Sequence, residues 1–272
     1  MWKRMITGVL LFLFLVAVLF FGGYIFGAVA LFVCGLCVYE ELDAMKKGGH
    51  RPVSWPVFVT LLACVPLMLF IRPLAIVPVL MFCCFAVIFS VMRREKPVLT
   101  DVMVSLMPVL TIILPGLCLI SLSGVAPRPL QALMLTLVFT VSVGSDTFAL
   151  FTGTWIGGKK LCPQISPKKT VAGAVGGLAG AVGLTVLAGF VFPLCFADLT
   201  VHPLWVFALV GFVGGIAAQF GDMLASLVKR YCGVKDFGAL FPGHGGMMDR
   251  MDSILFSSVI IFCYHEIIVF LA

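Results

Sequence analysis

Runs of about 20 apolar residues dominate the sequence, and they limit what the chain can fold into. Inside a bilayer no water can satisfy an open backbone, so a segment that crosses it forms a helix. The hydrophobic share is 62%, well above the roughly half that is usual in soluble domains. Charged residues make up only 11% of the chain, too few to cover a water-soluble surface. The sequence therefore predicts an all-α, polytopic integral membrane protein.

The apolar runs predict nine transmembrane helices, at about 5–21, 23–41, 55–71, 73–92, 102–122, 129–151, 171–195, 203–224 and 253–271. The first run follows Lys3 and Arg4, as in a signal peptide, but no small-residue cleavage site follows it. We therefore expect a retained helix. No separate soluble domain fits, so we expect one integral domain, with five helices in 1–122 and four in 123–272.

The positions of lysine and arginine predict the orientation. With a cytoplasmic N-terminus and nine helices, all of the 18 Lys and Arg residues except Arg72 and Arg128 fall on the cytoplasmic side, where such residues are enriched. The C-terminus is then on the opposite side. The net charge of +6 mostly reflects this sidedness and helps the inner face meet anionic lipid headgroups. No basic domain with interleaved aromatics is present, so we expect no nucleic-acid partner.

Small residues recur four apart in two of the predicted helices, as Gly173/Gly177, Gly176/Gly180 and Gly211/Gly215. In lipid, such spacing lets helix backbones approach closely. We expect packing within the bundle, and a homodimer interface is the alternative. Most of the ten cysteines lie inside predicted helices, where a thiol acts as a small hydrophobe.

Acidic residues at membrane depth are costly and mark functional sites. If the helix at 203–224 continues, Asp222, Ser226, Lys229 and Arg230 share one face at i, i+4, i+7 and i+8. Asp249 and Asp252 precede the last predicted helix and are three apart. Carboxylates from separate elements with cations nearby suit Mg²⁺ holding phosphates. The alternative for the loop between them is a solvated connector.

Two polar segments contain groups suited to anions. FPGHGG, at 241–246, has glycines that let backbone amides approach a phosphate. The segment 144–170 contains Asp146 and ends in Ser166-Pro167-Lys168-Lys169-Thr170. Ser166 is expected to be an N-cap, with Pro167 at the first helical position. The resulting helix N-terminus is either an anion site or simply a capped end with lysines on the inner face.

Together these residues predict a membrane-embedded site at the cytoplasmic face that handles phosphates on a lipid. Phosphoryl or nucleotidyl transfer fits, because that chemistry is largely positioning and charge neutralisation. An ion or substrate transporter is an alternative from a different class, with Asp146 and Asp222 lining its pathway. Transport predicts acids spread through the membrane, whereas these polar groups gather on one side.

Residues 226–252 resemble the signature of phosphatidate cytidylyltransferases, also called CDP-diacylglycerol synthases. The resemblance rests on Ser226-x-x-Lys229-Arg230, Lys235-Asp236-Phe237-Gly238, Pro242-Gly243-His244-Gly245-Gly246 and Asp249-Arg250-x-Asp252. The stretch from Asp146 to Thr170 is similar to a second region of that family. One departure is Ala172, where the family usually has an acid before the glycine.

The resemblance implies that the chain makes CDP-diacylglycerol and pyrophosphate from CTP and phosphatidic acid, in a bacterial inner membrane. It implies Mg²⁺ as cofactor, held by Asp222 and Asp249, and a second cation such as K⁺. It implies a catalytic set of Lys229, Arg230, Lys235, Asp236, His244, Arg250 and Asp252. The substrate-binding set is Asp146, Ser166, Lys168, Lys169, Ser226, Gly245 and Gly246. The alternative within the same setting is a CTP-dependent polyprenol kinase.

Overall fold

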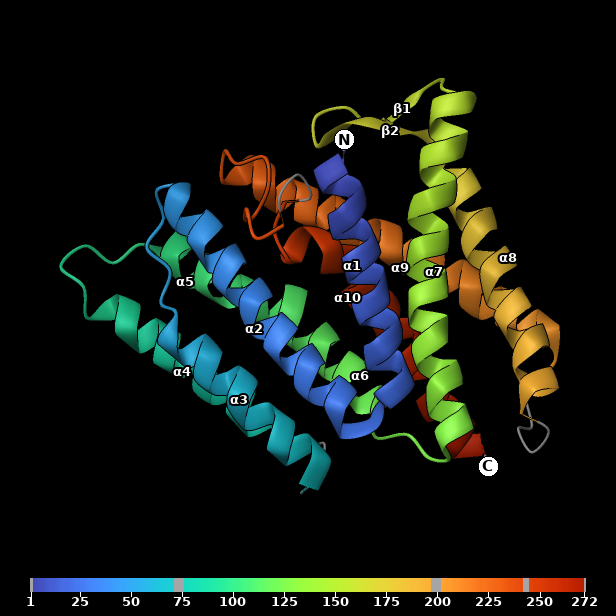
Figure 1. The fold of residues 1–272 in the computed structure, drawn as a ribbon. Helices are drawn as coiled ribbons and strands as arrows, with labels where there is room; N and C mark the ends of the chain where they lie inside the picture. The colour runs from blue at the N-terminus through green and yellow to red at the C-terminus, as the bar shows by residue number, and fades with distance from the viewer. Residues whose placement is uncertain (1, 71–75, 197–201, 242–244, 272) are drawn as a thin grey trace. The chain divides into compact units, whose positions relative to one another are not determined.

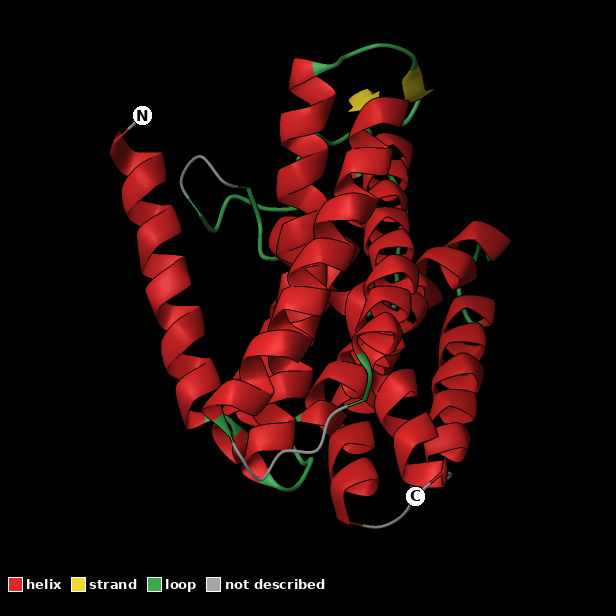
Figure 2. Cartoon of the chain, turned by 90° about the vertical axis from the view of Figure 1, so that its right-hand side faces the viewer, coloured by secondary structure: helices red, strands yellow, loops and turns green. Residues whose placement is uncertain are grey.

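The chain folds almost entirely into helices in the computed structural model, which describes residues 2–70, 76–196, 202–241 and 245–271 (Figures 1 and 2). The N-terminal half contains α1 (Trp2–Phe21), α2 (Gly23–Lys47), α3 (Trp55–Phe70), α4 (Ile76–Met92), α5 (Leu99–Pro108), the π-helical turn η2 (Val109–Ile113) and α6 (Leu114–Leu122). The C-terminal half contains α7 (Arg128–Trp155), strands β1 (Lys160–Cys162) and β2 (Ser166–Thr170), α8 (Val171–Cys195), α9 (Leu204–Tyr231) and α10 (Met248–Leu271). The predicted all-α, polytopic membrane fold is confirmed.

Six helical segments of the described chain are long and apolar enough to cross a membrane. They are α2, the continuous stretch Leu99–Leu122, α7, α8, α9 and α10. Three shorter apolar helices cover Gly8–Phe21, Trp55–Leu67 and Ile76–Met92. Each predicted apolar run therefore overlaps a helix, while the count of nine spans stays a prediction.

The chain divides into two compact units, which are described separately. The first unit comprises Met1–Val18, Tyr24–Gly124 and Val228–Met251. The second unit comprises Leu19–Gly23, Val125–Leu227 and Asp252–Ala272. The helices α9 and α10 each contribute residues to both units. The single integral domain with a division at residue 122 stays a prediction.

In the first unit, a buried carboxylate ties the loop after α2 to the start of α5. Asp101 accepts hydrogen bonds from the Arg51 amide at 3.0 Å and from Arg94 Nη1 at 2.7 Å. One turn later, Ser105 Oγ accepts the Val53 amide at 2.8 Å. Charge-assisted hydrogen bonds therefore anchor the loops at 46–52 and 93–97 to the first turn of α5.

In the second unit, glycines bring α7 and α8 into close contact, and the two helices lie side by side (Figure 1). A Cβ on Gly173 would lie 2.8 Å from the Ala149 carbonyl oxygen, and one on Gly177 would lie 2.7 Å from that of Ser145. Gly211 meets α8 in the same way, with a Cβ position 2.9 Å from Val182 Cα. The predicted packing of these glycines within the bundle is confirmed. A homodimer stays a prediction.

A short antiparallel hairpin of β1 and β2 connects α7 to α8. The prediction that Ser166 caps the helix is wrong, because residues 166–170 form strand β2. The N-cap is Thr170, whose backbone is extended and whose Oγ1 accepts the Gly173 amide at 3.0 Å. Serine and threonine are both favoured N-cap residues, and pairing with β1 keeps the chain extended up to Thr170.

Two helices are longer than predicted, and both extensions carry site residues. α9 continues to Tyr231, so Asp222, Ser226, Lys229 and Arg230 do share one helix. α10 begins at Met248 instead of 253. Asp249 and Asp252 therefore lie inside the first turns of α10, and the prediction that they precede the helix is wrong. A carboxylate in the first turn is favoured there by the helix dipole.

Candidate active site

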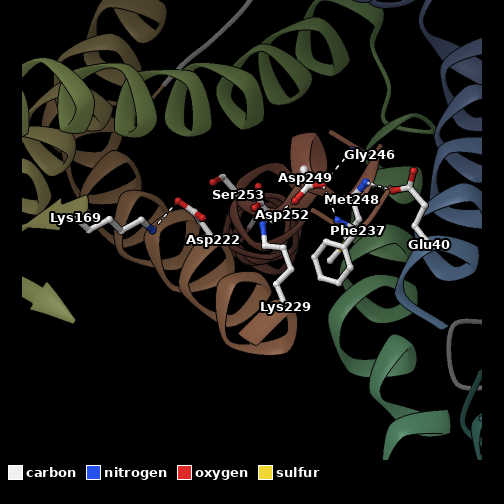
Figure 3. A network of polar contacts seen from close by, with 10 residues as sticks. All are labelled: Glu40, Lys169, Asp222, Lys229, Phe237, Gly246, Met248, Asp249, Asp252 and Ser253. Atoms are coloured by element: carbon white, nitrogen blue, oxygen red, sulfur yellow. Dashed lines mark hydrogen bonds and ion pairs between the residues drawn. The ribbon is translucent and has the colours of Figure 1, made fainter. Parts of the chain in front are cut away.

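Asp249 is the centre of a polar cluster in the first unit, formed with Lys229, Phe237 and Gly246 (Figure 3). Its Oδ1 accepts Lys229 Nζ at 2.7 Å, and its Oδ2 accepts the amides of Phe237 at 2.9 Å and Gly246 at 3.0 Å. The Asp249 side chain is only 4% exposed. A carboxylate has about four lone-pair positions, so the contacts from the described residues use three and leave one on Oδ1.

Lys229 is held from two directions. Its ammonium pairs with Asp249 and also lies 5.3 Å from the centroid of the Phe237 ring. Phe237 is buried and supplies both this ring and the amide that Asp249 accepts. A cation over an aromatic face gains on the order of 1 kcal/mol. Lysine, acid and ring therefore form one preorganised group.

The glycine-rich turn places the Gly246 amide against Asp249. Gly245 has φ of +81°, a conformation that side chains disfavour, and its carbonyl accepts the Phe241 amide at 3.0 Å. Phe241 and Gly245 thus lie side by side just before α10. Residues 242–244 lie outside the described part of the chain, and with them the predicted catalytic residue His244.

Glu40, near the end of α2, is a residue of this region that the sequence analysis missed. It is buried, and its Oε2 accepts the Met248 amide at 2.9 Å (Figure 3). The signal was present in the sequence: two consecutive acids, Glu40 and Glu41, follow an apolar run of membrane length. Such acids are costly at that depth and need a partner.

The second unit has a cavity of about 480 Å³ that several predicted residues line. Lys169 and Asp222 meet there in an ion pair of 2.6 Å, in which both side chains are about a quarter exposed. The other predicted residues in its wall are Asp146 and Lys168. Lys160 adds a further cation, and Leu150, Leu161 and Met223 add apolar surface. The wall therefore combines cations, carboxylates and hydrocarbon.

Asp146 and Asp252 are linked through Ser253 in the second unit. Ser253 Oγ donates to Asp146 Oδ1 at 3.2 Å, and the Ser253 amide donates to Asp252 Oδ1 at 2.8 Å. Asp252 is buried, whereas Asp146 is exposed to the cavity that it lines. The structure thus brings together two predicted acids from α7 and α10.

The remaining predicted residues lie on exposed or partly exposed positions. Arg230 lies in the last turn of α9, Lys235 and Asp236 follow in the loop, and Arg250 is exposed in the first turn of α10. Ser226 lies on α9, and Ser166 lies at the start of β2. Exposed cations of this kind favour the approach of an anionic ligand.

The two predicted metal ligands belong to different units, Asp222 to the second and Asp249 to the first. A metal site that joins them stays a prediction. In the described residues, no three His, Cys, Asp or Glu side chains gather as a protein-only metal site. Mg²⁺ habitually takes one or two carboxylates and completes its shell with water and substrate oxygens. The partly exposed Asp222 carboxylate and the remaining Asp249 lone pair are hard oxygen donors of that kind.

Fold and side chains together define a class: a polytopic membrane protein whose last four helices and their connections carry paired acids and lysines. The chain belongs to the cytidylyltransferase family, whose model matches residues 2–268.

Individual relatives match mainly over part of their length. A phosphatidate cytidylyltransferase of Brucella abortus is 36% identical over 141 residues, covering 52% of this chain and 49% of that protein. One from Thermotoga maritima is 37% identical over 135 residues, covering 48% of each. One from Rickettsia bellii is 32% identical over 163 residues, covering 60% of this chain and 69% of that protein. The chain thus spans about half the length of the first two relatives.

Proposed function

We propose that the protein is a phosphatidate cytidylyltransferase, which transfers CMP from CTP to phosphatidic acid and releases pyrophosphate. The observation that carries the proposal is that two acids of this cytidylyltransferase-family chain each form an ion pair with a lysine, Asp222 with Lys169 and Asp249 with Lys229. Relatives named for this activity support it.

The proposed reaction is an in-line displacement at phosphorus. An oxygen of the phosphatidate phosphate attacks the α-phosphorus of CTP and forms a new P–O–P bond. The bond from the α-phosphorus to the oxygen that bridges it to the β-phosphorus breaks, and pyrophosphate leaves with that electron pair. No covalent enzyme intermediate is needed, so the protein has to position two anions and neutralise their charge.

The lysines and arginines supply that neutralisation. Lys229 and Arg230 lie on the last turn of α9, and Lys235 and Arg250 are exposed nearby in sequence. In the second unit the cavity offers Lys168 and Lys169 beside apolar side chains. That combination suits the phosphate of a lipid, whose headgroup is anionic and whose body is hydrocarbon.

Asp222 and Asp249 would hold Mg²⁺, and a second cation such as K⁺ is proposed in the same site. Bound Mg²⁺ would supply charge neutralisation on the phosphates of CTP. Asp249 is suited to this role because three hydrogen bonds already fix its orientation.

Purified protein, phosphatidic acid, Mg²⁺ and CTP labelled at the α-phosphate test the proposal directly. The expected result is label in the lipid extract and unlabelled pyrophosphate in the aqueous phase. Label that stays in CDP, with a polyprenol as acceptor, would instead identify a CTP-dependent lipid kinase. No CTP consumption with either lipid, in protein that moves ions across vesicles, would identify a transporter.

A further inference from the structure

We propose that Glu40 is a positioning residue for Asp249: its buried carboxylate holds the start of α10 and the glycines around it. The functional part of this inference rests on the proposed function, whereas its structural part does not. All residues involved belong to the first unit.

The first argument is the hydrogen bond to the helix start. The first four amides of a helix have no partner inside the helix. Glu40 Oε2 accepts that of Met248 at 2.9 Å, across 208 residues of sequence. The bond is charge-assisted and shielded from water, because Glu40 is 7% exposed. Since Met248 directly precedes Asp249, this bond fixes the position of the backbone from which the Asp249 side chain extends.

The second argument is the close approach of two glycines to the same carboxylate. A Cβ on Gly238 would lie 2.7 Å from Glu40 Cδ, and a Cβ on Gly246 would lie 2.6 Å from it. Neither glycine has a positive φ, so space and not backbone conformation excludes a side chain. Gly246 also donates to Asp249 Oδ2, and Gly238 follows Phe237, which does the same. Glu40 therefore packs against both segments whose amides orient Asp249.

The adjacent acid provides a matched comparison. Glu41 is fully buried on the same helix, but its Oε2 accepts Thr111 Oγ1 of η2 at 2.6 Å. This hydrogen bond thus joins α2 to η2. Among the described residues, only Glu40 of this pair accepts the Met248 amide. If the end of α2 only needed acidic residues, substitution of Glu40 and of Glu41 would have the same effect. If Glu40 positions Asp249, only substitution of Glu40 should disturb the start of α10.

Hydrogen–deuterium exchange of the peptide covering 245–251, in detergent, tests the structural part. We expect Glu40→Ala to raise exchange of the Met248 amide by about tenfold or more, because a buried charge-assisted acceptor is lost. Glu40→Gln keeps an acceptor oxygen and should restore most of the protection. Glu41→Gln should leave the peptide unchanged. Unchanged exchange in Glu40→Ala, or an equal increase in Glu41→Gln, would overturn the proposal.

A second variant keeps the test decisive if Glu40→Ala does not fold. Gly238→Ala pushes the Glu40 carboxylate away while leaving it in the chain, so it should raise the same exchange. In the double variant Glu40→Ala/Gly238→Ala the clash is gone, and the two effects should be strongly non-additive. Simple addition of the two effects would mean that Gly238 does not act through Glu40.

Kinetics test the functional part. Glu40→Ala should lower kcat about tenfold with little change in the KM for CTP, because a carboxylate is misplaced while the phosphate-binding cations stay. Glu40→Gln should recover most of the rate. A wild-type protein that puts no label into lipid would reject the proposed function, while the exchange data would still decide the role of Glu40. Loss of protection at Met248 with unchanged kcat would reject the positioning role.

Discussion

Asp222 and Asp249 are both paired with a lysine, but their surroundings differ. Asp249 is nearly buried and receives three hydrogen bonds, whereas Asp222 is partly exposed in a cavity wall. Charges that are buried together depend on each other far more strongly than exposed ones. Replacement by asparagine should therefore reduce activity at both positions, but it should lower the stability of the protein only at Asp249.

Asp249→Asn should reduce CTP incorporation by about 100-fold or more, because a fixed charge at the reacting phosphates is lost. It should also lower the free energy of unfolding by on the order of 3 kcal/mol, since the Lys229 side chain, only 14% exposed, is left without its counter-charge. Labelled-lipid formation and thermal unfolding in detergent measure the two effects. Glu95→Gln, on an exposed loop, is the control and should change neither.

Asp222→Asn should reduce CTP incorporation to a similar extent but change the free energy of unfolding by less than about 1 kcal/mol, because its ion pair with Lys169 is partly exposed. A Mg²⁺ titration of the residual activity should require a higher concentration for half-saturation. Normal activity with an unchanged Mg²⁺ requirement would remove Asp222 from the metal-binding role.

Single residues show where sequence reasoning succeeds and where it ends. Asp249 was predictable because its neighbours in sequence, Gly246 and Arg250, define a recognisable pattern. The partner of Glu40 was not predictable, since Met248 is 208 residues away and only the fold brings the two together. Thr170 was missed because a strand pairing, which is also non-local, decides which hydroxyl caps α8.

At the level of elements, the spacing of glycines determines how closely α7 and α8 pack. Lipid offers no hydrophobic drive for helices to associate, so close van der Waals contact has to provide it. Gly144 approaches the Gly180 carbonyl in the same interface, so both helices contribute small residues. This spacing was visible in the sequence. The partner helix was not, because a four-residue repeat identifies a face but not its neighbour.

Gly177→Ala should destabilise the protein, because its Cβ would lie 2.7 Å from the backbone oxygen of Ser145, which cannot move aside alone. We expect a loss of about 1–3 kcal/mol, the usual cost of overpacking. Gly183→Ala, on the same helix with nothing within 4 Å of its Cβ, is the matched control. It should be neutral or slightly stabilising, because alanine is the better helix former. Thermal unfolding of both variants in one detergent makes the comparison.

Helix ends were less predictable than helix cores. The apolar run 171–195 matches α8 at both ends, because polar strand residues precede it. α2 runs on to Lys47, beyond the predicted residue 41, since its last two turns carry Glu40, Glu41 and Asp43. An apolar run ends at the first charged residues, so hydropathy places the helix end there. The helix itself continues for as long as its backbone and side chains find partners.

For the whole molecule, charge placement defines a proposed orientation. Nearly all lysines and arginines lie on one side if the N-terminus is cytoplasmic, and the proposed site lies on that side. CTP is a cytoplasmic substrate under the proposed function, so the orientation and the chemistry agree.

Reporter fusions test the orientation. Alkaline phosphatase, which is active only outside the cytoplasm, should be active when fused after Ala272 in a bacterial host. The same reporter inserted at Glu95, between two predicted spans, should be inactive. The reverse pattern would place the proposed site on the wrong side for CTP.

The length of α9 has a consequence for how the protein would meet its lipid. Its 28 residues extend about 42 Å, longer than the roughly 30 Å hydrocarbon layer. If it crosses the layer from Leu204, its last turns, with Lys229 and Arg230, reach the depth of the headgroups. A lipid substrate would then arrive by lateral diffusion within the leaflet. Turnover should follow surface dilution: inert detergent added at fixed bulk phosphatidate slows the reaction, because the mole fraction in the micelle falls.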